Sequence, residues 1–185
     1  MKHFCVLLVG CCLMGTSHGA LAYELRGARS CSGWQESRLD QKAQSARGAV
    51  GIMQMLPSTA ADPAIGIAGI DKDAERNIEA GSKYLRLLAD KYLNDEELTP
   101  VNRTLMSFAA YNAGPGNLLK FRRLTEKSGN NPNIWFQNVE YAAARIVGQE
   151  TVNYVSNIYK YYLAYKLAEE RGAGRPESSN LKTNL

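Results

Sequence analysis

Residues 35–60 read QESRLDQKAQSARGAVGIMQMLPSTA, and this segment is the most informative about the fold. A single glutamate, Glu36, precedes a turn that is punctuated by Gly48 and Gly51 and ends in a Met-Gln pair. Glycine accepts backbone dihedrals that other residues resist, so the chain can fold back tightly here. We expect this fold-back to bring the Met-Gln pair against the carboxyl group of Glu36. Such an apolar enclosure raises the pKa of a carboxyl and keeps its proton available near neutral pH, as a general acid requires.

Apolar residues recur at steps of three and four in the later chain, which predicts amphipathic helices. The predicted helices span residues 78–92, 105–112, 139–147 and 151–169. The second must end near Gly114-Pro115-Gly116, because proline and its flanking glycines break a helix. Segments with the period-two alternation of strands are absent from the sequence. The predicted fold is therefore all-α, a compact bundle of short helices in one domain with at most a minimal hairpin element near Glu36.

Polar and turn-forming residues mark the predicted connections between these helices. Residues 62–69 show little periodicity, residues 94–100 are polar, and residues 128–132 form a cluster of turn residues. The tail 171–185, with its glycines, proline and serines, is predicted to be disordered.

The N-terminus is typical of a secretion signal, predicted as residues 1–22. A polar start precedes an apolar run that is too short to span a bilayer, and Ala20-Leu21-Ala22 fits a small-x-small cleavage site. The alternative is a lipoprotein processing box at Leu8-Val9-Gly10-Cys11, although Cys11 lies very close to the start. We therefore expect a periplasmic protein or one secreted to the cell wall, with a lipid anchor and outer-membrane association as the alternative.

Cysteine and histidine usage excludes several kinds of site. Cleavage after Ala22 leaves Cys31 as the single cysteine, which we expect to be a buried apolar residue. Both histidines, His3 and His18, lie in the predicted signal, so His-based triads and His-containing metal sites are excluded from the mature chain. We predict no metal and no cofactor.

The charge balance is mildly basic, with a formal net charge of +4 and a pI near 8.9. A mildly basic face suits the approach to an anionic polymer such as the cell wall, although ordinary solubility explains the same charge. The chain has no run of lysine or arginine long enough to predict nucleic-acid binding.

Two further clusters carry polar groups at helix ends. Tyr111 and Asn112 stand just before the Gly-Pro-Gly turn, where their tips can bind sugar hydroxyls or merely end a helix. Glu150-Thr151 opens the last helix, where acidic and hydroxyl groups offset exposed amides without any further function. Tyr154 then either points toward the site or packs in the core.

Taken in this order, the clusters resemble the successive signatures of the lytic transglycosylases with a goose-type lysozyme fold. Residues 77–85 (NIEAGSKYL) are similar to the helix between the first two signatures, and residues 134–162 look most like the branch of the membrane-bound transglycosylase F enzymes. The resemblance covers residues 34–165, and it implies a catalytic domain of this family over residues 23–170.

The resemblance implies an enzyme that cleaves the glycan strands of peptidoglycan between N-acetylmuramic acid and N-acetylglucosamine and forms a 1,6-anhydro ring. Glu36 matches the single catalytic acid, which acts first as acid and then as base, unlike the usual pair of carboxylates of glycosidases. Positions that match substrate-binding residues of the family are Ser45, Gln54, Tyr111, Asn112, Glu140 and Tyr154. We expect a monomer.

Two alternatives remain open at this point. A hydrolytic lysozyme-like muramidase needs a second carboxylate to activate water, for which Asp40 and Asp62 are the nearest candidates. A non-catalytic peptidoglycan-binding module of a wall-spanning apparatus needs no acid. One departure from the family concerns residues 23–35, whose glycines and serines predict a short, weak helix ahead of Glu36.

Overall fold

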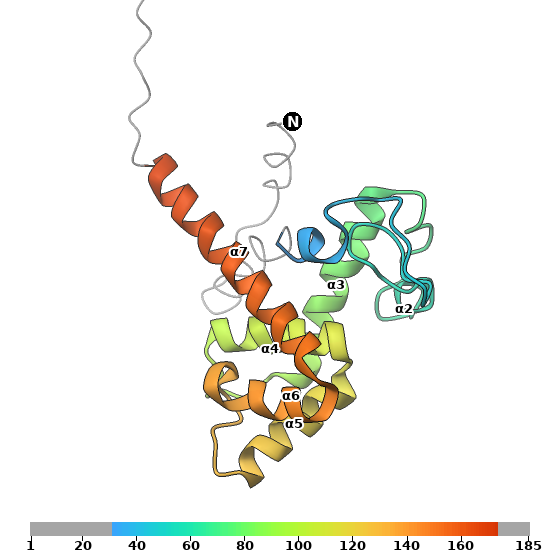
Figure 1. The fold of residues 1–185 in the computed structure, drawn as a ribbon. Coiled ribbons are helices and arrows are strands. Elements are labelled where there is room, and N and C mark those ends of the chain that lie inside the picture. The colour runs from blue at the N-terminus through green and yellow to red at the C-terminus, as the bar shows by residue number, and fades with distance from the viewer. Residues whose placement is uncertain (1–30, 174–185) are drawn as a thin grey trace, which may run out of the picture.

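The computed structural model describes residues 31–173, with side chains through residue 168 (Figure 1). The predicted signal peptide, most of the predicted tail and most of the weak helix ahead of Glu36 lie outside the described residues.

The described chain is helical, as predicted. A first helical segment spans residues 31–37. The elements that follow are α2 (Pro57–Ala60), α3 (Ala74–Tyr92), α4 (Pro100–Ala113), α5 (Pro115–Lys127), the irregular helical turn η1 (Trp135–Val139), α6 (Glu140–Val147) and α7 (Gln149–Ala173). Figure 1 shows residues 31–72 beside the N-terminal half of α3, while α5 and α6 gather at the opposite end. Helix α4 packs against α3, α5 and α7 and so lies at the centre.

The predicted helices are confirmed, whereas α2, α5 and the turn η1 are not predicted from the sequence. Helix α4 ends at Ala113, as the Gly-Pro-Gly sequence predicts, and Gly114 turns the chain at a φ of 89°. The same glycine also precedes α5, whose first residue is Pro115. Proline at the first helical position has its φ already fixed and lacks only an N–H that would have no helical partner. The Gly-Pro-Gly sequence therefore ends one helix and starts another.

The minimal hairpin predicted near Glu36 is present as two isolated β-bridges. Val50 forms isolated antiparallel bridges with Gln44 and with Met55, and the described residues form no longer strand. The Val50 N–H donates to the Met55 carbonyl at 2.9 Å, and the Met55 N–H donates to the Val50 carbonyl at 3.2 Å. These bonds fold residues 44–55 back on themselves, as the glycine pattern predicts.

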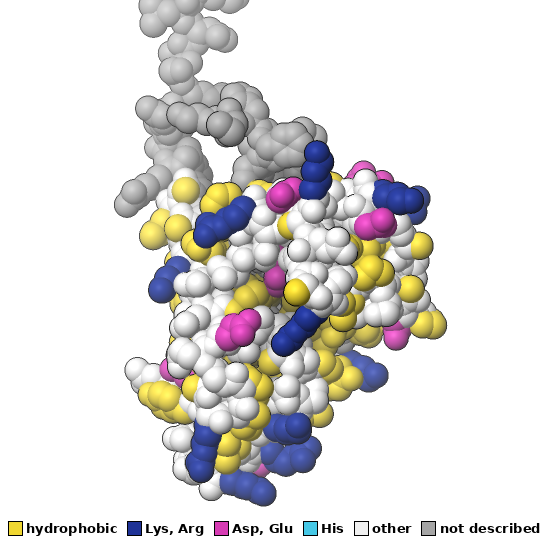
Figure 2. Space-filling view, turned by 45° about the vertical axis from the view of Figure 1, so that its right-hand side comes forward, with side chains coloured by type: hydrophobic (Ala, Val, Ile, Leu, Met, Phe, Trp, Pro, Cys, Tyr) yellow, Lys and Arg dark blue, Asp and Glu magenta, His cyan; other side chains and the backbone are white. Residues whose placement is uncertain are grey.

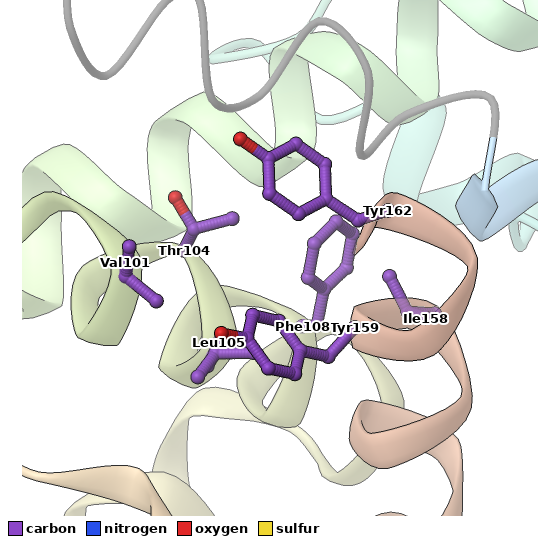
Figure 3. Close-up of a pocket in the computed structure, with 7 residues that line it drawn as sticks. All are labelled: Val101, Thr104, Leu105, Phe108, Ile158, Tyr159 and Tyr162. Atoms are coloured by element: carbon purple, nitrogen blue, oxygen red, sulfur yellow. The ribbon is translucent and has the colours of Figure 1, made fainter. Parts of the chain in front are cut away.

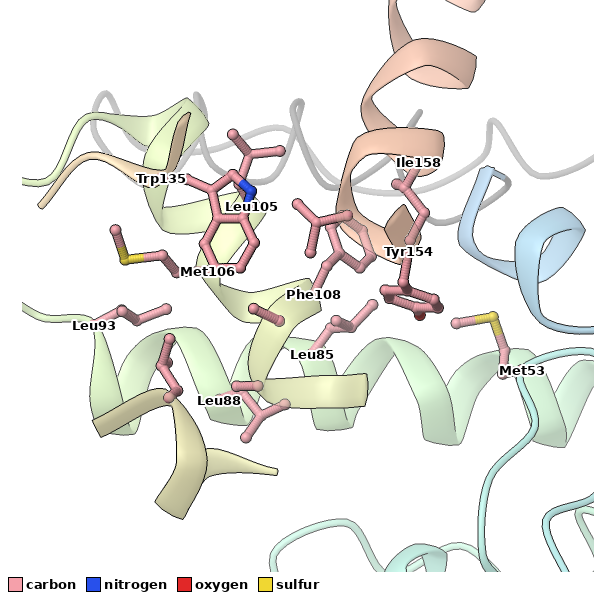
Figure 4. Packing of buried hydrophobic residues seen from close by; sticks show 14 of the residues in the cluster. Met53, Leu85, Leu88, Leu93, Leu105, Met106, Phe108, Trp135, Tyr154 and Ile158 are labelled. Carbon is pink, nitrogen blue, oxygen red and sulfur yellow. The ribbon is translucent and has the colours of Figure 1, made fainter. Parts of the chain in front are cut away.

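One hydrophobic core runs through the molecule between α3, α4 and α7 (Figure 4). Trp135, Phe108 and Leu85 are fully buried in it. Met53 lies at one end of this core, beside Tyr154 of α7 (Figure 4). Cys31 is buried, as predicted. The core therefore extends directly to the segment that carries Glu36.

A buried asparagine in the first turn of α3 holds the hairpin against the core. The side-chain Oδ1 of Asn77 accepts a hydrogen bond from the Met53 N–H at 2.7 Å. Its Nδ2 donates to the carbonyls of Val50 at 2.9 Å and Ile70 at 3.0 Å. One amide thus satisfies three backbone groups of two separate loop segments, each of which would be costly to bury without a partner.

Two glycines make this close approach possible. Gly51 has a φ of 75°, and a Cβ there would lie 2.3 Å from the amide nitrogen of Asn77. Gly81 lies one turn after Asn77 and faces Met53. A Cβ at Gly81 would lie only 2.8 Å from the Met53 side chain. Any side chain at either position would push the hairpin away from α3.

We expect Asn77→Ala to destabilise the protein by about 3 kcal/mol, because it removes three buried hydrogen bonds and leaves the Met53 N–H without its partner. Urea unfolding at neutral pH measures the change. Asn94→Ala is the matched control, since Asn94 is exposed in the loop after α3, and it should change the free energy of unfolding by less than about 0.5 kcal/mol. Equal stability of the two variants would contradict the anchoring role of Asn77.

Candidate active site

Glu36 lies in the last turn of the first helical segment, just before the chain reverses. Arg38 and Leu39 both have left-handed backbone conformations, with φ of 58° and 64°. This conformation is costly for residues other than glycine and persists only where the surroundings enforce it. The hydroxyl of Ser37 donates to the Ile52 carbonyl at 2.9 Å, which ties the end of the helix to the hairpin. The sharp reversal therefore fixes Glu36 relative to the hairpin.

The carboxyl group of Glu36 receives a hydrogen bond from the last helix. The hydroxyl of Tyr154 donates to Oε1 of Glu36 at 2.5 Å. Tyr154 is buried, and its hydroxyl also lies 3.4 Å from the hydroxyl of Ser32. A hydrogen bond to a carboxylate is short and strong, so this contact both orients the carboxyl and stabilises its charged form.

Burial changes the acidity of Glu36. Loss of hydration raises the pKa of its carboxyl from the ordinary 4.5 to about 7, while the hydrogen bond from Tyr154 acts in the opposite direction. Near neutral pH the group is therefore present in both protonated and charged forms, as a residue that gives and later takes a proton needs. Burial, followed by the nearby charge of Glu36, raises the pKa of Tyr154 and of Tyr111, so both phenols stay protonated.

Tyr111 of α4 faces the same carboxyl. Its hydroxyl donates to the Met53 carbonyl at 2.7 Å, and its ring centroid lies 5.4 Å from that of Tyr84 on α3. The tyrosine thereby joins α3, α4 and the hairpin around Glu36. The predicted contact of Tyr111 with a glycan is not tested by this geometry and stays a prediction.

Asn112, by contrast, faces the start of α7. Its Oδ1 accepts a hydrogen bond from the Thr151 hydroxyl at 2.7 Å, while the rest of the side chain is exposed. This bond connects the end of α4 to the first turn of α7. Tyr154 lies three residues after Thr151, about one turn further along the same helix. Asn112 thus supports the position of Tyr154, and its contact with a glycan stays a prediction.

Ser45 and Gln54 shape the hairpin. The hydroxyl of Ser45 accepts from the Ala49 N–H at 3.0 Å. The amide nitrogen of Gln54 donates to the carbonyls of Ala43 at 3.1 Å and Gly51 at 2.9 Å. Both side chains are half-buried and close the turn in which they lie. Their predicted glycan contacts are not tested by these bonds and stay predictions.

Glu140 lies in a different part of the structure. It opens α6, and its Oε1 accepts from the Gln137 N–H at 2.7 Å, next to a backbone kink at which Gln137 has a φ of 59°. No hydrogen bond within residues 31–168 joins Glu140 to Glu36 or Tyr154. Its role in binding stays a prediction, and its observed role is to stabilise the kink.

Three side chains that build the site are not predicted from the sequence to take part in it. Ser32 lies beside the Tyr154 hydroxyl, Thr151 bonds to Asn112, and Asn77 anchors the hairpin. Asn77 leaves a detectable signal, since it stands one turn before Gly81, immediately ahead of the predicted helix 78–92. Ser32 and Thr151 leave none, because small hydroxyl residues near helix ends are common.

A hollow between α4 and α7 is lined by apolar and aromatic side chains, among them Val101, Leu105 and Ile158 (Figure 3). Basic side chains are scattered over the face shown in Figure 2, with several at its lower end. Within residues 31–168, no group of three or more metal-binding side chains is present.

Comparison with known proteins agrees with this geometry. The family model described as the transglycosylase SLT domain matches residues 33–134, which include Glu36, the hairpin and Tyr111. The chain belongs to this family. The family resemblance and the all-α, lysozyme-like fold predicted from the sequence are thereby confirmed.

The curated relatives include proteins named membrane-bound lytic murein transglycosylase F. Those of Pseudomonas fluorescens and Histophilus somni are 33% and 34% identical to this chain over 145 and 180 residues. These matches cover 70% and 88% of this SLT-family chain, but 28% and 36% of the relatives. The chain therefore spans about a third of the length of these relatives.

A solved structure shares the fold. The 70 kDa soluble lytic transglycosylase of Escherichia coli matches with a TM-score of 0.56 and 29% identity, over 78% of this chain and 22% of that one. Across residues 31–173, no helix of the SLT-family chain is long and apolar enough to cross a membrane.

We expect Tyr154→Phe to raise the pKa of Glu36 further, by about one pH unit, because the lost hydrogen bond stabilises the charged carboxylate. Carbon-13 NMR titration of the glutamate carboxyl groups measures this directly, without any assay of activity. Tyr159→Phe, one turn and a half along α7, should leave the titration unchanged. A lower pKa of Glu36 in Tyr154→Phe would contradict the assigned role.

We expect the raised pKa of Glu36 to make stability depend on pH. The folded protein binds this proton more tightly than the unfolded chain, so the resulting stabilisation is complete below pH 4.5 and is lost as the pH rises through about 7. Glu36→Gln is neutral throughout, so wild type should lose about 3 kcal/mol relative to this variant between pH 4 and pH 8. Urea unfolding across this range measures the difference, and parallel curves for the two proteins would refute it.

Proposed function

We propose that this chain is a peptidoglycan lytic transglycosylase that cleaves the bond between N-acetylmuramic acid and N-acetylglucosamine. The observation that carries the proposal is one carboxyl, Glu36, with a pKa of about 7 and a hydrogen bond from Tyr154. Membership of the SLT family and relatives named lytic murein transglycosylases support it.

The geometry assigns separate tasks to the two carboxyl oxygens of Glu36. Tyr154 donates to Oε1, so the acidic proton resides on the other oxygen, Oε2. In the first step Oε2 gives this proton to the glycosidic oxygen while the bond from that oxygen to C1 of muramic acid breaks. The carboxylate left behind is stabilised by the hydrogen bond from Tyr154.

In the second step the same carboxylate acts as a base. It takes the proton of the C6 hydroxyl of muramic acid as that oxygen bonds to C1, which closes a 1,6-anhydro ring and restores the acid. No water is consumed, so a second carboxylate is not required. A pKa of about 7 suits both steps, since neither form of Glu36 is strongly favoured at neutral pH.

The hydrolytic alternative receives less support from the candidate second carboxylates. Asp40 is exposed, and its Oδ1 accepts from the Lys42 N–H at 2.8 Å. Asp62 is also exposed and accepts from the Ala64 N–H at 2.9 Å. Both carboxylates close local turns. The non-catalytic alternative leaves the raised pKa of Glu36 without a use.

We further propose that the enzyme works as a monomer in the periplasm or at the cell wall. The signal-like N-terminus supports export, and the names of the membrane-bound relatives support the alternative of a lipid anchor through Cys11 at the outer membrane.

We expect purified protein to release muropeptides with 1,6-anhydro ends from isolated sacculi, and Glu36→Gln to reduce this release at least about a hundredfold. Mass spectrometry of the soluble products, which distinguishes anhydro from reducing ends, measures both. Glu126→Gln, an exposed glutamate on α5, is the matched control and should retain full activity. Reducing muramic acid as the main product would favour the hydrolytic alternative.

A further inference from the structure

A small hollow lies between the C-terminal end of α5 and α6, at the end of the molecule away from residues 31–72 (Figure 1). We call it the α5–α6 hollow. Its volume is about 90 Å³, which is more than one water molecule needs and suits one small group of a ligand rather than a whole ring. Its lining includes Leu124, Ser128, Asn130, Tyr141, Ala142 and Arg145.

Tyr141 presents an open aromatic ring beside this hollow. It is 58% exposed, the largest fraction among the large hydrophobic side chains of the described residues. Within residues 31–168 its ring pairs with no other ring and with no cation. The ring of Trp34 is also exposed, but the guanidinium of Arg38 covers it at 5.0 Å. An uncovered aromatic face at the surface is typical of a binding site.

Two polar side chains of the hollow are available to a ligand. Within residues 31–168 the side-chain amide of Asn130 makes no hydrogen bond, and the guanidinium of Arg145 makes neither a hydrogen bond nor an ion pair. Arg145 stands four residues after Tyr141 on α6, so the two side chains share one face of the helix. Leu124 and Ala142 add apolar surface. The hollow therefore combines donors, acceptors and a small apolar wall.

The turn after α5 holds Asn130 in position. The Asn130 N–H donates to the Thr125 carbonyl at 3.1 Å, and the Asn131 N–H donates to the side-chain oxygen of Asn138 at 2.9 Å. These bonds fix the wall of the hollow before any ligand arrives. Binding therefore costs little in the ordering of this turn.

This combination favours a sugar over an anion or a protein partner. Arg145 is the one cation among the lining residues, and the other polar groups are neutral amides and hydroxyls, which suit hydroxyl and acetamido groups. The open ring of Tyr141 offers a flat apolar surface to the face of a sugar ring. A protein partner needs an interface of about 1,000 Å², whereas this hollow accepts only a small group.

We propose that the α5–α6 hollow is a second, non-catalytic binding site for the glycan strand. The acetamido group of an N-acetylated sugar enters the hollow beside Asn130 and Arg145, and the sugar ring lies on Tyr141. The proposal rests on the proposed function, since it takes this sugar to belong to the polymer that is cut at Glu36. Two linked binding events hold a polymer more tightly than either one alone, so the site keeps the enzyme on the strand between cuts.

Direct binding tests this without any cleavage. The probe is chitotetraose, a neutral tetramer of N-acetylglucosamine, titrated into Glu36→Gln protein and followed by amide NMR. We expect shifts at the residues of the hollow, and an affinity there about fivefold weaker when Tyr141→Ala or Asn130→Ala is added. Leu167→Ala removes another exposed apolar side chain, on α7, and is the matched control with unchanged affinity. Shifts confined to the surroundings of residue 36, or equal affinities in all variants, would overturn the proposal.

Cleavage then separates this proposal from the proposed function. The quantity measured is the ratio of kcat/KM on intact sacculi to kcat/KM on a soluble peptidoglycan tetrasaccharide, which offers no second stretch of strand. Tyr141→Ala should lower this ratio about fivefold relative to wild type, and Leu167→Ala should leave it unchanged. An unchanged ratio in Tyr141→Ala would refute the role of the hollow on the polymer. Chitotetraose binding at the hollow of a protein that cleaves neither substrate would sink the proposed function and leave the glycan site standing.

Discussion

The buried amide of Asn77 is the constraint on which the rest of the site depends. Its side chain bonds to both the hairpin and the loop before α3, and it does so inside the core, where water cannot replace it. The hairpin has only isolated bridges of its own and would not hold one position unaided. Fixing it fixes Met53, whose carbonyl receives Tyr111 and whose side chain fills the space over Gly81.

The acidity of Glu36 follows from this packing through two opposed effects. The hairpin and α7 remove water from the carboxyl, which favours the neutral form, and Tyr154 donates a hydrogen bond, which favours the charged form. Burial alone would make a carboxyl that holds its proton too firmly to act as an acid. The hydrogen bond moderates this effect, and the two together place the pKa near neutrality.

The sequence predicts much of this arrangement because the relevant signals are local. Helical periodicity, the glycines of the hairpin and the order of the signatures lead to the fold, to Glu36 and to the tyrosines. Other features depend on contacts between distant segments, which no local pattern contains. Neither the partnership of Asn112 with Thr151 nor the separation of Glu140 from Glu36 can be inferred from spacing. Helix α5 is missed because Gly114-Pro115-Gly116 reads as a break, although proline also starts helices.

The hydrogen bond between Tyr154 and Glu36 joins residues 118 positions apart, near the two ends of the described chain. Contacts of this separation form only when most of the intervening chain is in place. Before α7 docks, Glu36 is an ordinary solvated glutamate, charged at neutral pH and unable to protonate a leaving group. The acid is thus a product of completed folding. A chain still being synthesised, held unfolded for export or cut within its last helix carries the same glutamate in an inert form.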